Sequence, residues 1–406
     1  MKSERLFGAI GEIDEKLIWD AVNDKASDKK TLNTNSRRLK WAFASLGVLA
    51  AAAVILVIIH GVSVLNKNLG KSLPQLTKLT VAEETPEAMG YEGYMAYEIS
   101  ELVNANPWSE DAKLSNLPVY RNCLSYDKYN IVSGADFEAM KQFLTEIAGR
   151  LNMDTESLKI TDDTPSEEYK AAVLEKADGE IPEGYFDPTK VTAEQNGIKI
   201  QVDVSMTAEI FFKTPVPLPD GYNFSNYSSY EDSLAAAKYL KETYRNLIGM
   251  DNPQISVSGG DYNIYLKQGY HIEFYNKNGD LAEDILNYNF NRAAFYCNDN
   301  GELYMVRIFN PNLSDKTGDY PVISASEAET LLLNGNYITT VPYGIAGKEY
   351  ISKTELVYRT GTYEKYYMPY YRFYVELPEI QRENGIKDYG AYYVPAVRSE
   401  YIENMP

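Results

Sequence analysis

An uncharged apolar run at residues 41–59, WAFASLGVLAAAAVILVII, limits most strongly what this chain can fold into. Apolar character then continues, with one histidine and one serine, to Leu65. As a helix, the run would rise about 28 Å, close to the roughly 30 Å hydrocarbon core of a bilayer. A helix of a soluble core rarely stays apolar on every face for this length. We therefore expect a transmembrane anchor over residues 41–65.

Basic residues on both sides of the run indicate how the anchor is oriented. Five lysines or arginines lie between positions 29 and 40, and three lie between positions 67 and 78. This bias favours a cytoplasmic amino terminus. Because 40 mostly polar residues precede the run and no clear cleavage site follows it, an uncleaved signal anchor is expected. Residues 1–40 are then cytoplasmic, and residues 66–406 are extracytoplasmic on the cell membrane.

The overall charge of the chain restricts its partners. Acidic residues outnumber basic ones by 58 to 39, which gives a formal net charge of -19. Such a chain lacks the positive field that holds DNA or RNA, so no nucleic-acid partner is expected. Two cysteines and two histidines are also too few for a disulfide scaffold or a histidine-built metal centre. No metal site and no cofactor are expected.

An apolar face with helical spacing recurs in the predicted cytoplasmic tail, residues 1–40. So short a tail cannot bury this face in a core of its own. Residues 1–24 carry more acidic than basic side chains, which favours a protein partner over an anionic bilayer surface. A disordered tail with chance periodicity is the remaining alternative. The candidate partner-binding residues are Leu6, Ile10, Ile13 and Leu17.

Composition divides the chain after the anchor into a tether and two folded regions. Residues 66–89 show little periodicity and predict a tether. Residues 90–213 are expected to form a first α+β unit. Pro215, Pro217 and Pro219 then interrupt the pattern and predict a boundary. Residues 220–406 are expected to form a second α+β region.

Local signals predict helices that alternate with antiparallel strands. Helix starts are expected near Ser133, Ser229 and Ser324, the last with Glu327 in a capping box. Asn196-Gly197 is the strongest hairpin signal. Strands are predicted at residues 198–204, 254–258, 262–267, 270–275, 292–297, 302–309, 353–359, 366–377 and 389–397. The expected fold class is α+β: a single transmembrane helix, then an ectodomain of helices packed on antiparallel sheets.

Tyrosines are concentrated near the carboxyl end, and all 35 follow the anchor. In the predicted strand 366–377, alternation puts Tyr371 and Phe373 on a core face, where the helix from Ser324 should pack Leu332. The opposite face could be a solvent-facing platform for a peptide or glycan, or it could cover the sheet against a neighbouring unit. The candidate platform residues are Tyr366, Tyr370 and Tyr374.

The sequence contains no recognisable catalytic constellation. The H-E-x-x-H, G-x-S-x-G and phosphate-loop patterns are missing, and His271 is expected to be a solvated strand residue. Cys123 and Cys297 could form a bridge, although Cys297 alternates in a strand like a small buried thiol. We expect no enzyme activity. Carboxylates expected to be solvated rather than catalytic include Asp261, Glu273, Asp280, Glu283 and Asp284.

Several segments resemble known regulatory proteins. The stretch YPVISASEAETLLLNGNY at residues 320–337, with YMPYYRF at 367–373 and VPAV at 394–397, is similar to the carboxy-terminal region of PepSY-like and YycH/YycI-type regulatory proteins of Gram-positive bacteria. AIGEIDEKLIWDA, residues 9–21, is similar to tails of anti-sigma-like membrane proteins of Firmicutes. The resemblance covers about a third of the chain and implies a helix packed on an antiparallel sheet outside the membrane.

Two functional hypotheses follow. The first is a single-pass regulatory or sensory protein whose ectodomain binds a partner or envelope ligand and whose tail contacts a kinase or a sigma factor. The second is an envelope-binding protein in which the anchor and tail only hold a glycan- or peptide-binding ectodomain in place. Exchanging the tail distinguishes them, because only the first hypothesis requires its sequence.

Overall fold

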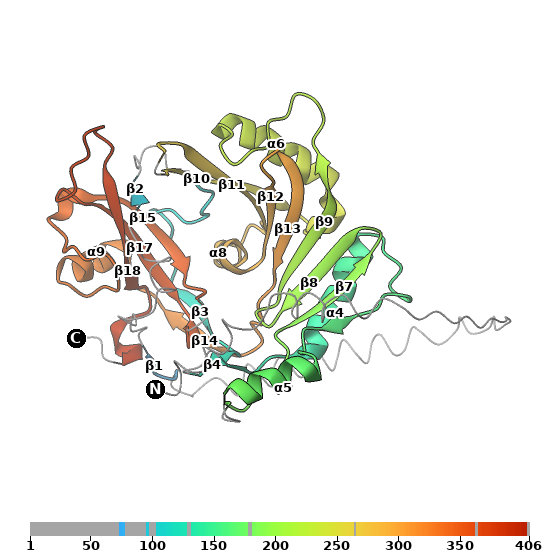
Figure 1. The fold of residues 1–406 in the computed structure, drawn as a ribbon. Coiled ribbons are helices and arrows are strands. Elements are labelled where there is room, and N and C mark those ends of the chain that lie inside the picture. The colour runs from blue at the N-terminus through green and yellow to red at the C-terminus, as the bar shows by residue number, and fades with distance from the viewer. Residues whose placement is uncertain are drawn as a thin grey trace, which may run out of the picture. The chain divides into compact units, whose positions relative to one another are not determined.

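The computed structural model describes residues 73–77, 95–96, 103–127, 131–177, 181–263, 265–361 and 364–403. These residues form an α+β fold of helices and mainly antiparallel sheets (Figure 1). Each helix in these ranges is too short or too polar to cross a bilayer. The predicted tail and anchor at residues 1–65, including Leu6, Ile10, Ile13 and Leu17, lie outside the described residues.

The chain divides into two compact units. The first comprises residues 1–74 and 166–180, and its described helix is α5, Glu167–Lys176. The Ser166 side chain caps this helix by accepting a hydrogen bond from the Tyr169 N–H. Alpha-helix α5 was not predicted from the sequence. The second unit comprises residues 75–165 and 181–406 and contains every other element described below.

A long antiparallel sheet has the strand order β10-β11-β12-β13-β9-β8-β7-β6. Its turn at Asn196-Gly197 joins β7 to β8, and both residues adopt positive φ, as a two-residue hairpin turn requires. The predicted hairpin is therefore confirmed. The strands are β6 Thr161–Asp162, β7 Lys190–Gln195, β8 Ile198–Asp203, β9 Thr207–Pro217, β10 Pro253–Tyr262, β11 Gln268–Asn276, β12 Arg292–Cys297 and β13 Glu302–Phe309.

Helices α4 (Phe137–Arg150), α6 (Tyr230–Thr243) and α7 (Arg245–Ile248) share one apolar core with the long sheet. Alpha-helix α4 packs against β7 and β8, and α6 packs against β10 and β11. The expected helices are confirmed, and Ser229 caps α6 as predicted. Asp136, rather than Ser133, caps α4, because its carboxylate accepts the Ala139 N–H.

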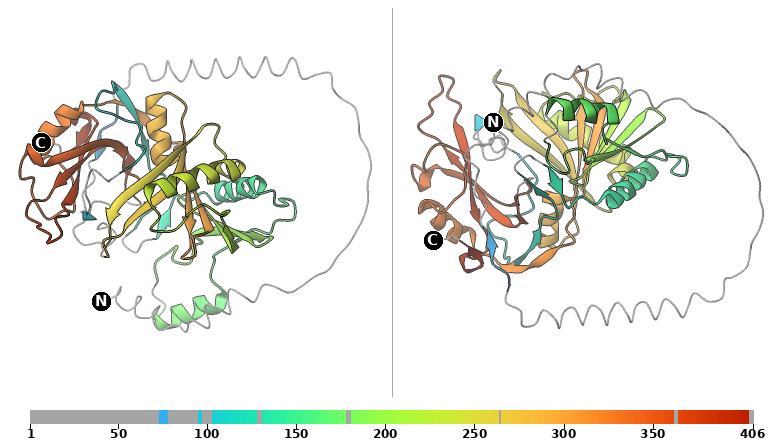
Figure 2. Two further views of the ribbon diagram at one scale, coloured as in Figure 1. Left: turned by 90° about the horizontal axis from the view of Figure 1, so that it is seen from above. Right: turned by 60° about the horizontal axis from the view of Figure 1, so that its bottom comes forward.

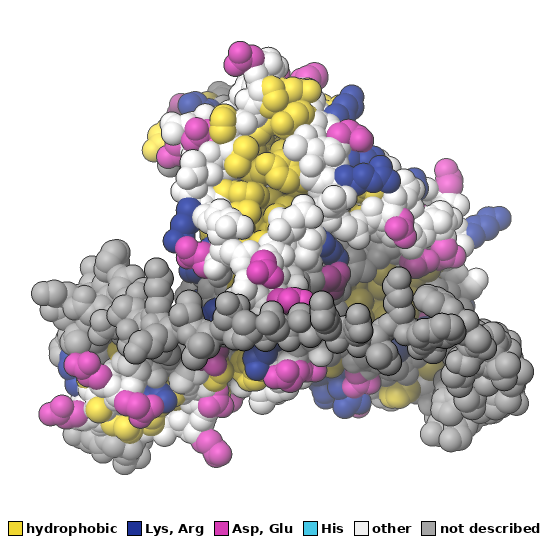
Figure 3. Space-filling model, turned by 90° about the vertical axis from the view of Figure 1, so that its right-hand side faces the viewer, with side chains coloured by type: hydrophobic (Ala, Val, Ile, Leu, Met, Phe, Trp, Pro, Cys, Tyr) yellow, Lys and Arg dark blue, Asp and Glu magenta, His cyan; other side chains and the backbone are white. Residues whose placement is uncertain are grey.

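Apolar side chains at the margin of this core reach the surface near α6 and β9. Phe212, Val216 and Leu218 pack against the core but stay half-buried. Tyr222 is 40% exposed, and its ring lies 4.8 Å from that of Tyr239 in α6. Figure 3 shows a band of apolar side chains on the side where α6 and β9 lie in Figure 1. The helices therefore do not cover this core completely.

The predicted domain boundary between residues 213 and 220 is wrong. Strand β9 runs through Pro215 and Pro217 and pairs with β13 up to Pro217. Its pairing with β8 ends at Phe212, so the prolines lie where β9 has a neighbour on one side only. A residue without an N–H is tolerated at such an open edge. Residues from both predicted units consequently share one sheet and one core.

Two further sheets enclose a second core. Their strand orders are β15-β17-β18-β2 and β14-β3-β16, both antiparallel. Helices α8 (Leu281–Phe290) and α9 (Ala325–Leu333) contribute apolar side chains to this core. The strands are β2 Met95–Ala96, β3 Asn116–Arg121, β14 Lys316–Pro321, β15 Ile351–Tyr358, β16 Tyr366–Tyr367, β17 Pro369–Glu376 and β18 Asp388–Pro395.

Short elements complete the described chain. Strand β1, Leu76–Thr77, pairs in parallel with β19, Ile402–Glu403, and Leu76 is fully buried. Part of the predicted tether at residues 66–89 is therefore an ordered strand. Strands β4 (Ser125–Tyr126) and β5 (Val132–Ser133) form a small hairpin. The 3-10 helices are η2 Lys348–Tyr350 and η3 Ser399–Tyr401.

The capping box that was predicted for α9 is confirmed. The Ser324 hydroxyl accepts the Glu327 N–H, and the Glu327 carboxylate accepts the Ser324 N–H. Gly335 follows the helix with φ +83°, a conformation that suits glycine. Leu332 of α9 lies in the same core cluster as Phe373, so the predicted docking of this helix onto the sheet is also confirmed.

Helix α8 links the two cores. Its side chains enter the second core, and it contacts β11 and β12 of the long sheet as well as β15. Figures 1 and 2 show α8 between the long sheet and the sheet that contains β17 and β18. The side of the latter sheet that carries Arg372 and Tyr393 faces α8, because both residues line one cavity together with Tyr288 of α8.

Candidate functional site

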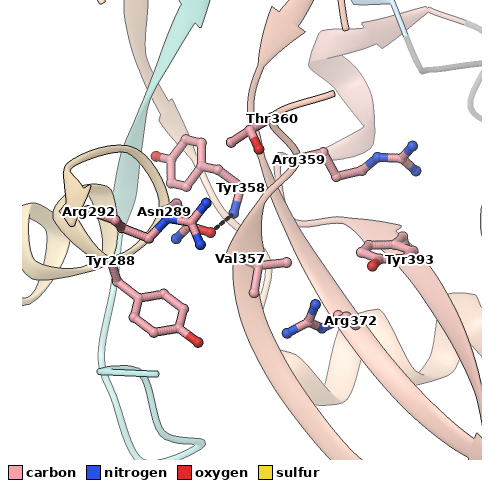
Figure 4. Close-up of a pocket in the computed structure, with 9 residues that line it drawn as sticks. All are labelled: Tyr288, Asn289, Arg292, Val357, Tyr358, Arg359, Thr360, Arg372 and Tyr393. Carbon is pink, nitrogen blue, oxygen red and sulfur yellow. Dashed lines mark hydrogen bonds between the residues drawn. The ribbon is translucent and has the colours of Figure 1, made fainter. Parts of the chain in front are cut away.

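A small polar cavity lies where α8, the start of β12 and the end of β15 meet β17 and β18 (Figure 4). Its volume is about 140 Å³. Three arginines from distant parts of the sequence, Arg292, Arg359 and Arg372, contribute to its wall. The remaining lining residues are Tyr288, Asn289, Val357, Tyr358, Thr360 and Tyr393.

Asn289 fastens α8 to β15 at the edge of the cavity. Its Oδ1 atom accepts a hydrogen bond from the Tyr358 N–H at 3.0 Å, which Figure 4 shows as a dashed line. Its Nδ2 donates to the Ile285 carbonyl at 2.7 Å. Asp280 caps the start of α8 by accepting the Glu283 N–H. The Asn289–Tyr358 hydrogen bond thus fixes the carboxyl end of α8 to β15, while the Asp280 cap stabilises the amino end of the helix itself.

Arg372 is held in place by a buried carboxylate on the neighbouring strand. Residues 355 and 372 are directly opposite each other in the pairing of β15 with β17. Arg372 donates from Nε and Nη2 to Glu355 Oε2 at 3.1 and 2.5 Å. Lys353 and Asn104 bind the other oxygen of Glu355, whose side chain is only 3% exposed. The position of the guanidinium is therefore set by a hydrogen-bonded network.

Glu355 is charged in this network. Burial by itself would raise the pKa of its carboxyl, but the positive charges of Arg372 and Lys353 and the hydrogen bond from Asn104 lower the pKa to about 2. Arg372 in turn lies 5.1 Å from the ring of Tyr374, where the ring face attracts the cation. The pair is therefore ionised across the physiological pH range.

Arg292 reaches the cavity from the long sheet. Its Nη1 donates to both carboxylate oxygens of Glu273, at 3.1 and 3.3 Å, and its guanidinium lies 4.7 Å from the Phe309 ring. Nε of Arg292 is buried and has no hydrogen-bond partner among the described residues. The side chain as a whole is 27% exposed, so the cavity is accessible from solvent on this side.

Arg359 is the most enclosed arginine of the wall. Its Nε donates to Glu364 at 2.8 Å. Its guanidinium lies 5.0 Å from the Tyr393 ring and 5.5 Å from the Tyr370 ring. Figure 4 shows its side chain directed toward the Tyr393 side of the cavity. Arg359 therefore packs its charged guanidinium against the Tyr393 ring.

Tyr288 supplies a phenol opposite these cations. Its ring packs edge to face on Tyr275, with centroids 5.4 Å apart. Figure 4 shows its hydroxyl directed toward the part of the cavity near Arg372. Burial, together with the nearby charge of Glu355, raises the pKa of Tyr288 well above its ordinary value. Tyr288 is consequently a neutral hydrogen-bond donor.

The wall of the cavity is rich in hydrogen-bond donors. Its wall contains guanidinium, phenol, hydroxyl and amide groups, and the described residues that line it include no carboxylate, histidine or cysteine. The described residues also contain no group of three or more His, Cys, Asp and Glu placed to hold a metal ion.

The predicted tyrosine platform needs correction. Alternation along β17 is as predicted, with Tyr371 and Phe373 in the core. Tyr370, however, is only 1% exposed, because Arg359 and Tyr393 pack against its ring. The strand also breaks at Met368, so Tyr366 belongs to β16 in a different sheet, and Tyr366 and Tyr374 are half-buried. The three tyrosines do not form one solvent-facing surface.

Sequence reasoning missed the arginines of the cavity. Helix α8, which carries Tyr288 and Asn289, was not predicted from the sequence. The separate strand expected at 262–267 is also wrong, because β10 ends at Tyr262. The available signal was a cation inside an aromatic strand, as in YYRFY around Arg372. A charged side chain in a strand that packs against another element requires a partner of opposite charge.

Other polar candidates have structural roles or lie at the surface. His271 is exposed. Asp284, predicted to be solvated, is buried and accepts the N–H groups of Asn278 and Gly279. Cys123 and Cys297 are free thiols, and burial raises the pKa of Cys297. The alternative of a disulfide is therefore not realised.

No protein-family model matches the chain, and no curated protein is significantly similar to it. Inferences about function consequently rest on the sequence and on the geometry of the cavity.

Proposed function

We propose that this protein is a single-pass membrane regulatory or sensory protein whose extracytoplasmic α+β region binds a ligand in the arginine- and tyrosine-lined cavity. In this proposal residues 1–40 are a cytoplasmic tail that contacts a kinase or a sigma factor, and residues 41–65 are the anchor. The bulk of the chain lies outside the membrane, where it resembles PepSY-like and YycH/YycI-type proteins.

The observation that carries the proposal is the lining of the cavity. Arg292 of β12, Arg372 of β17 and Arg359, which directly follows β15, line about 140 Å³ of space, and Nε of Arg292 lacks an acceptor among the described residues. Buried polar groups are normally paired, and unpaired ones concentrate where proteins bind ligands. The apolar run at 41–59 and the amphipathic pattern of the tail support the membrane and signalling parts.

The position of α8 supports a sensory role. A ligand in the cavity would contact α8 together with β15, β17 and β18, and α8 also packs on the long sheet. Binding that favours one position of α8 would then change how the two cores are held together. Such a shift provides a physical route from ligand to signal.

Co-purification tests the cytoplasmic part. Residues 1–40 with their native anchor serve as bait, and the matched control carries Ile10→Asp and Leu17→Asp on the apolar face. We expect a kinase or sigma factor to be recovered with the native tail and lost with the control. A neighbouring gene for such a protein would add independent support.

Exchange of the tail distinguishes the two hypotheses. Residues 1–40 are replaced by an unrelated basic tail in the full chain, and the cellular response is measured. The proposal predicts loss of the response with normal amounts of protein in the membrane. An intact response would instead identify an anchored envelope-binding protein with no signalling role for the tail.

A further inference from the structure

Two arginines of the cavity, Arg292 and Arg372, retain N–H groups that the described carboxylates do not engage. Arg372 directs Nε and Nη2 to Glu355, which leaves Nη1. Arg292 directs Nη1 to Glu273, which leaves Nη2 and the buried Nε. A buried donor without an acceptor costs about 1–3 kcal/mol. An acceptor that arrives from outside would remove this cost.

If Lys353 is counted, which binds Glu355 but does not itself line the cavity, the ion pairs around the cavity leave one positive charge in excess. Arg292 pairs with Glu273, and Arg359 pairs with Glu364. Arg372 and Lys353, by contrast, share the single carboxylate of Glu355. A ligand with one negative charge would balance this group. The local field is therefore opposite in sign to the net charge of -19 that the whole chain carries.

Size and shape limit the ligand further. An apolar cavity of about 150 Å³ holds a benzene ring, and this cavity measures about 140 Å³. The rings of Tyr288 and Tyr393 and the side chain of Val357 supply apolar wall. The space therefore suits a compact organic group of roughly ring size that carries one charged end.

We propose that the cavity binds the carboxylate of a small organic acid, with Arg292 and Arg372 donating to its oxygens and Tyr288 adding a neutral donor. This inference rests on the proposed function, since it names the ligand class of the same cavity. Planar guanidinium groups match the geometry of a carboxylate. A carboxylate also carries the single charge that the site lacks, whereas phosphate carries about 1.5 to 2 charges at neutral pH.

Three probes test the ligand class on the full chain in detergent by calorimetry and thermal melts. Benzoate has the expected charge and size, benzamide is its neutral isostere, and inorganic phosphate is the competing oxyanion. We expect benzoate to bind and to raise Tm, and benzamide and phosphate to bind at least about tenfold more weakly. Equal binding of benzamide, tighter binding of phosphate, or no binding of benzoate at tens of millimolar would overturn the proposal.

Variants test the residues. Arg292→Lys keeps the charge opposite Glu273 but removes Nε and Nη2, so benzoate affinity should fall about tenfold or more. Tyr288→Phe should weaken binding about threefold or more for the same reason. The matched controls are Arg307→Lys, which changes an arginine paired with Glu209 elsewhere on the long sheet, and Tyr371→Phe, whose hydroxyl binds the Ile323 carbonyl.

The controls should bind benzoate with unchanged affinity, and thermal melts without ligand show whether each variant folds. If Arg292→Lys and Arg307→Lys behave alike, the cavity arginines are structural and the inference is wrong. The chain with the exchanged tail distinguishes a failure of this inference from a failure of the proposed function. Its benzoate affinity should equal that of the native chain whether or not the cellular response survives.

Discussion

A single buried carboxylate should make the stability of the fold depend on pH. In the folded protein the pKa of Glu355 is about 2, against an ordinary 4.5. Because the folded-state pKa is depressed, the stabilisation is complete above about pH 5 and is lost as the pH falls toward 2. The difference corresponds to roughly 3 kcal/mol. Denaturant titrations between pH 3 and pH 7 would measure this slope.

Glu355→Gln should remove most of that slope and should also destabilise the protein at neutral pH. The substitution leaves the partly buried Arg372 guanidinium without an ionised partner, which should lower the free energy of unfolding by about 3–5 kcal/mol. Glu376→Gln is the matched control, since Glu376 pairs with a half-exposed Lys387 at 2.9 Å. Exposed pairs contribute about 0–1 kcal/mol. Similar losses for the two variants would contradict the buried network.

Tyr370 belongs to the folding of the protein rather than to an open surface. Its ring is buried beneath Arg359 and beside Tyr393, so Tyr370→Ala should cost about 3–5 kcal/mol in the free energy of unfolding. Tyr366→Ala, at a half-buried ring in β16, should cost less than half as much. Urea unfolding of both variants checks this order. A cost for Tyr370→Ala as small as that for Tyr366→Ala would instead favour an exposed tyrosine surface.

At the scale of one helix, two adjacent leucines of α9 give a sharp comparison. Leu332 is fully buried against the sheet, whereas Leu333 is 42% exposed. Leu332→Asp should lower the free energy of unfolding by about 4 kcal/mol or more, because a carboxylate enters an apolar core. Leu333→Asp should change it by about 0.5 kcal/mol or less. Chemical denaturation measures both, and comparable losses would show that the helix faces are misassigned.

Elements fixed by neighbouring residues were predictable, and those fixed by distant contacts were not. The Ser324–Glu327 capping box and the Asn196-Gly197 turn depend on residues within a few positions, and both are present. The pairing of β13 with β9 joins segments about ninety residues apart, and it contradicted a boundary inferred from prolines. The Asp280 cap of α8 was not recognised from the sequence, because a helix cap and a turn use the same residue types.

At the scale of the whole molecule, the predicted topology can be tested with single cysteines. Cys123→Ser and Cys297→Ser provide a background without native thiols. In that background Ser36→Cys should react with a membrane-impermeant thiol reagent only after cells are opened, because positive residues hold the tail inside. Ser72→Cys should react in intact cells. The reverse pattern, or labelling of both positions in intact cells, would contradict the orientation of the anchor.

The second unit should unfold as one body, because α8 packs into the second core and also contacts β11 and β12 of the long sheet. Phe290 at the end of α8 is buried against the rings of Tyr358 and Tyr367, at 5.3 and 5.4 Å, and β12 of the long sheet begins two residues later. Phe290→Ala should cost about 3–5 kcal/mol, and the loss should be felt in both sheets.

Hydrogen exchange of peptides from α4 and β17 in increasing denaturant would measure that coupling. We expect Phe290→Ala to shift the protection of both peptides to lower denaturant by the same amount. Leu144→Ala, in the core beneath α4, is the reciprocal control and should also shift both. If each substitution weakened only the peptide nearest to it, the two cores would fold independently. A ligand at the cavity then could not act on both through α8.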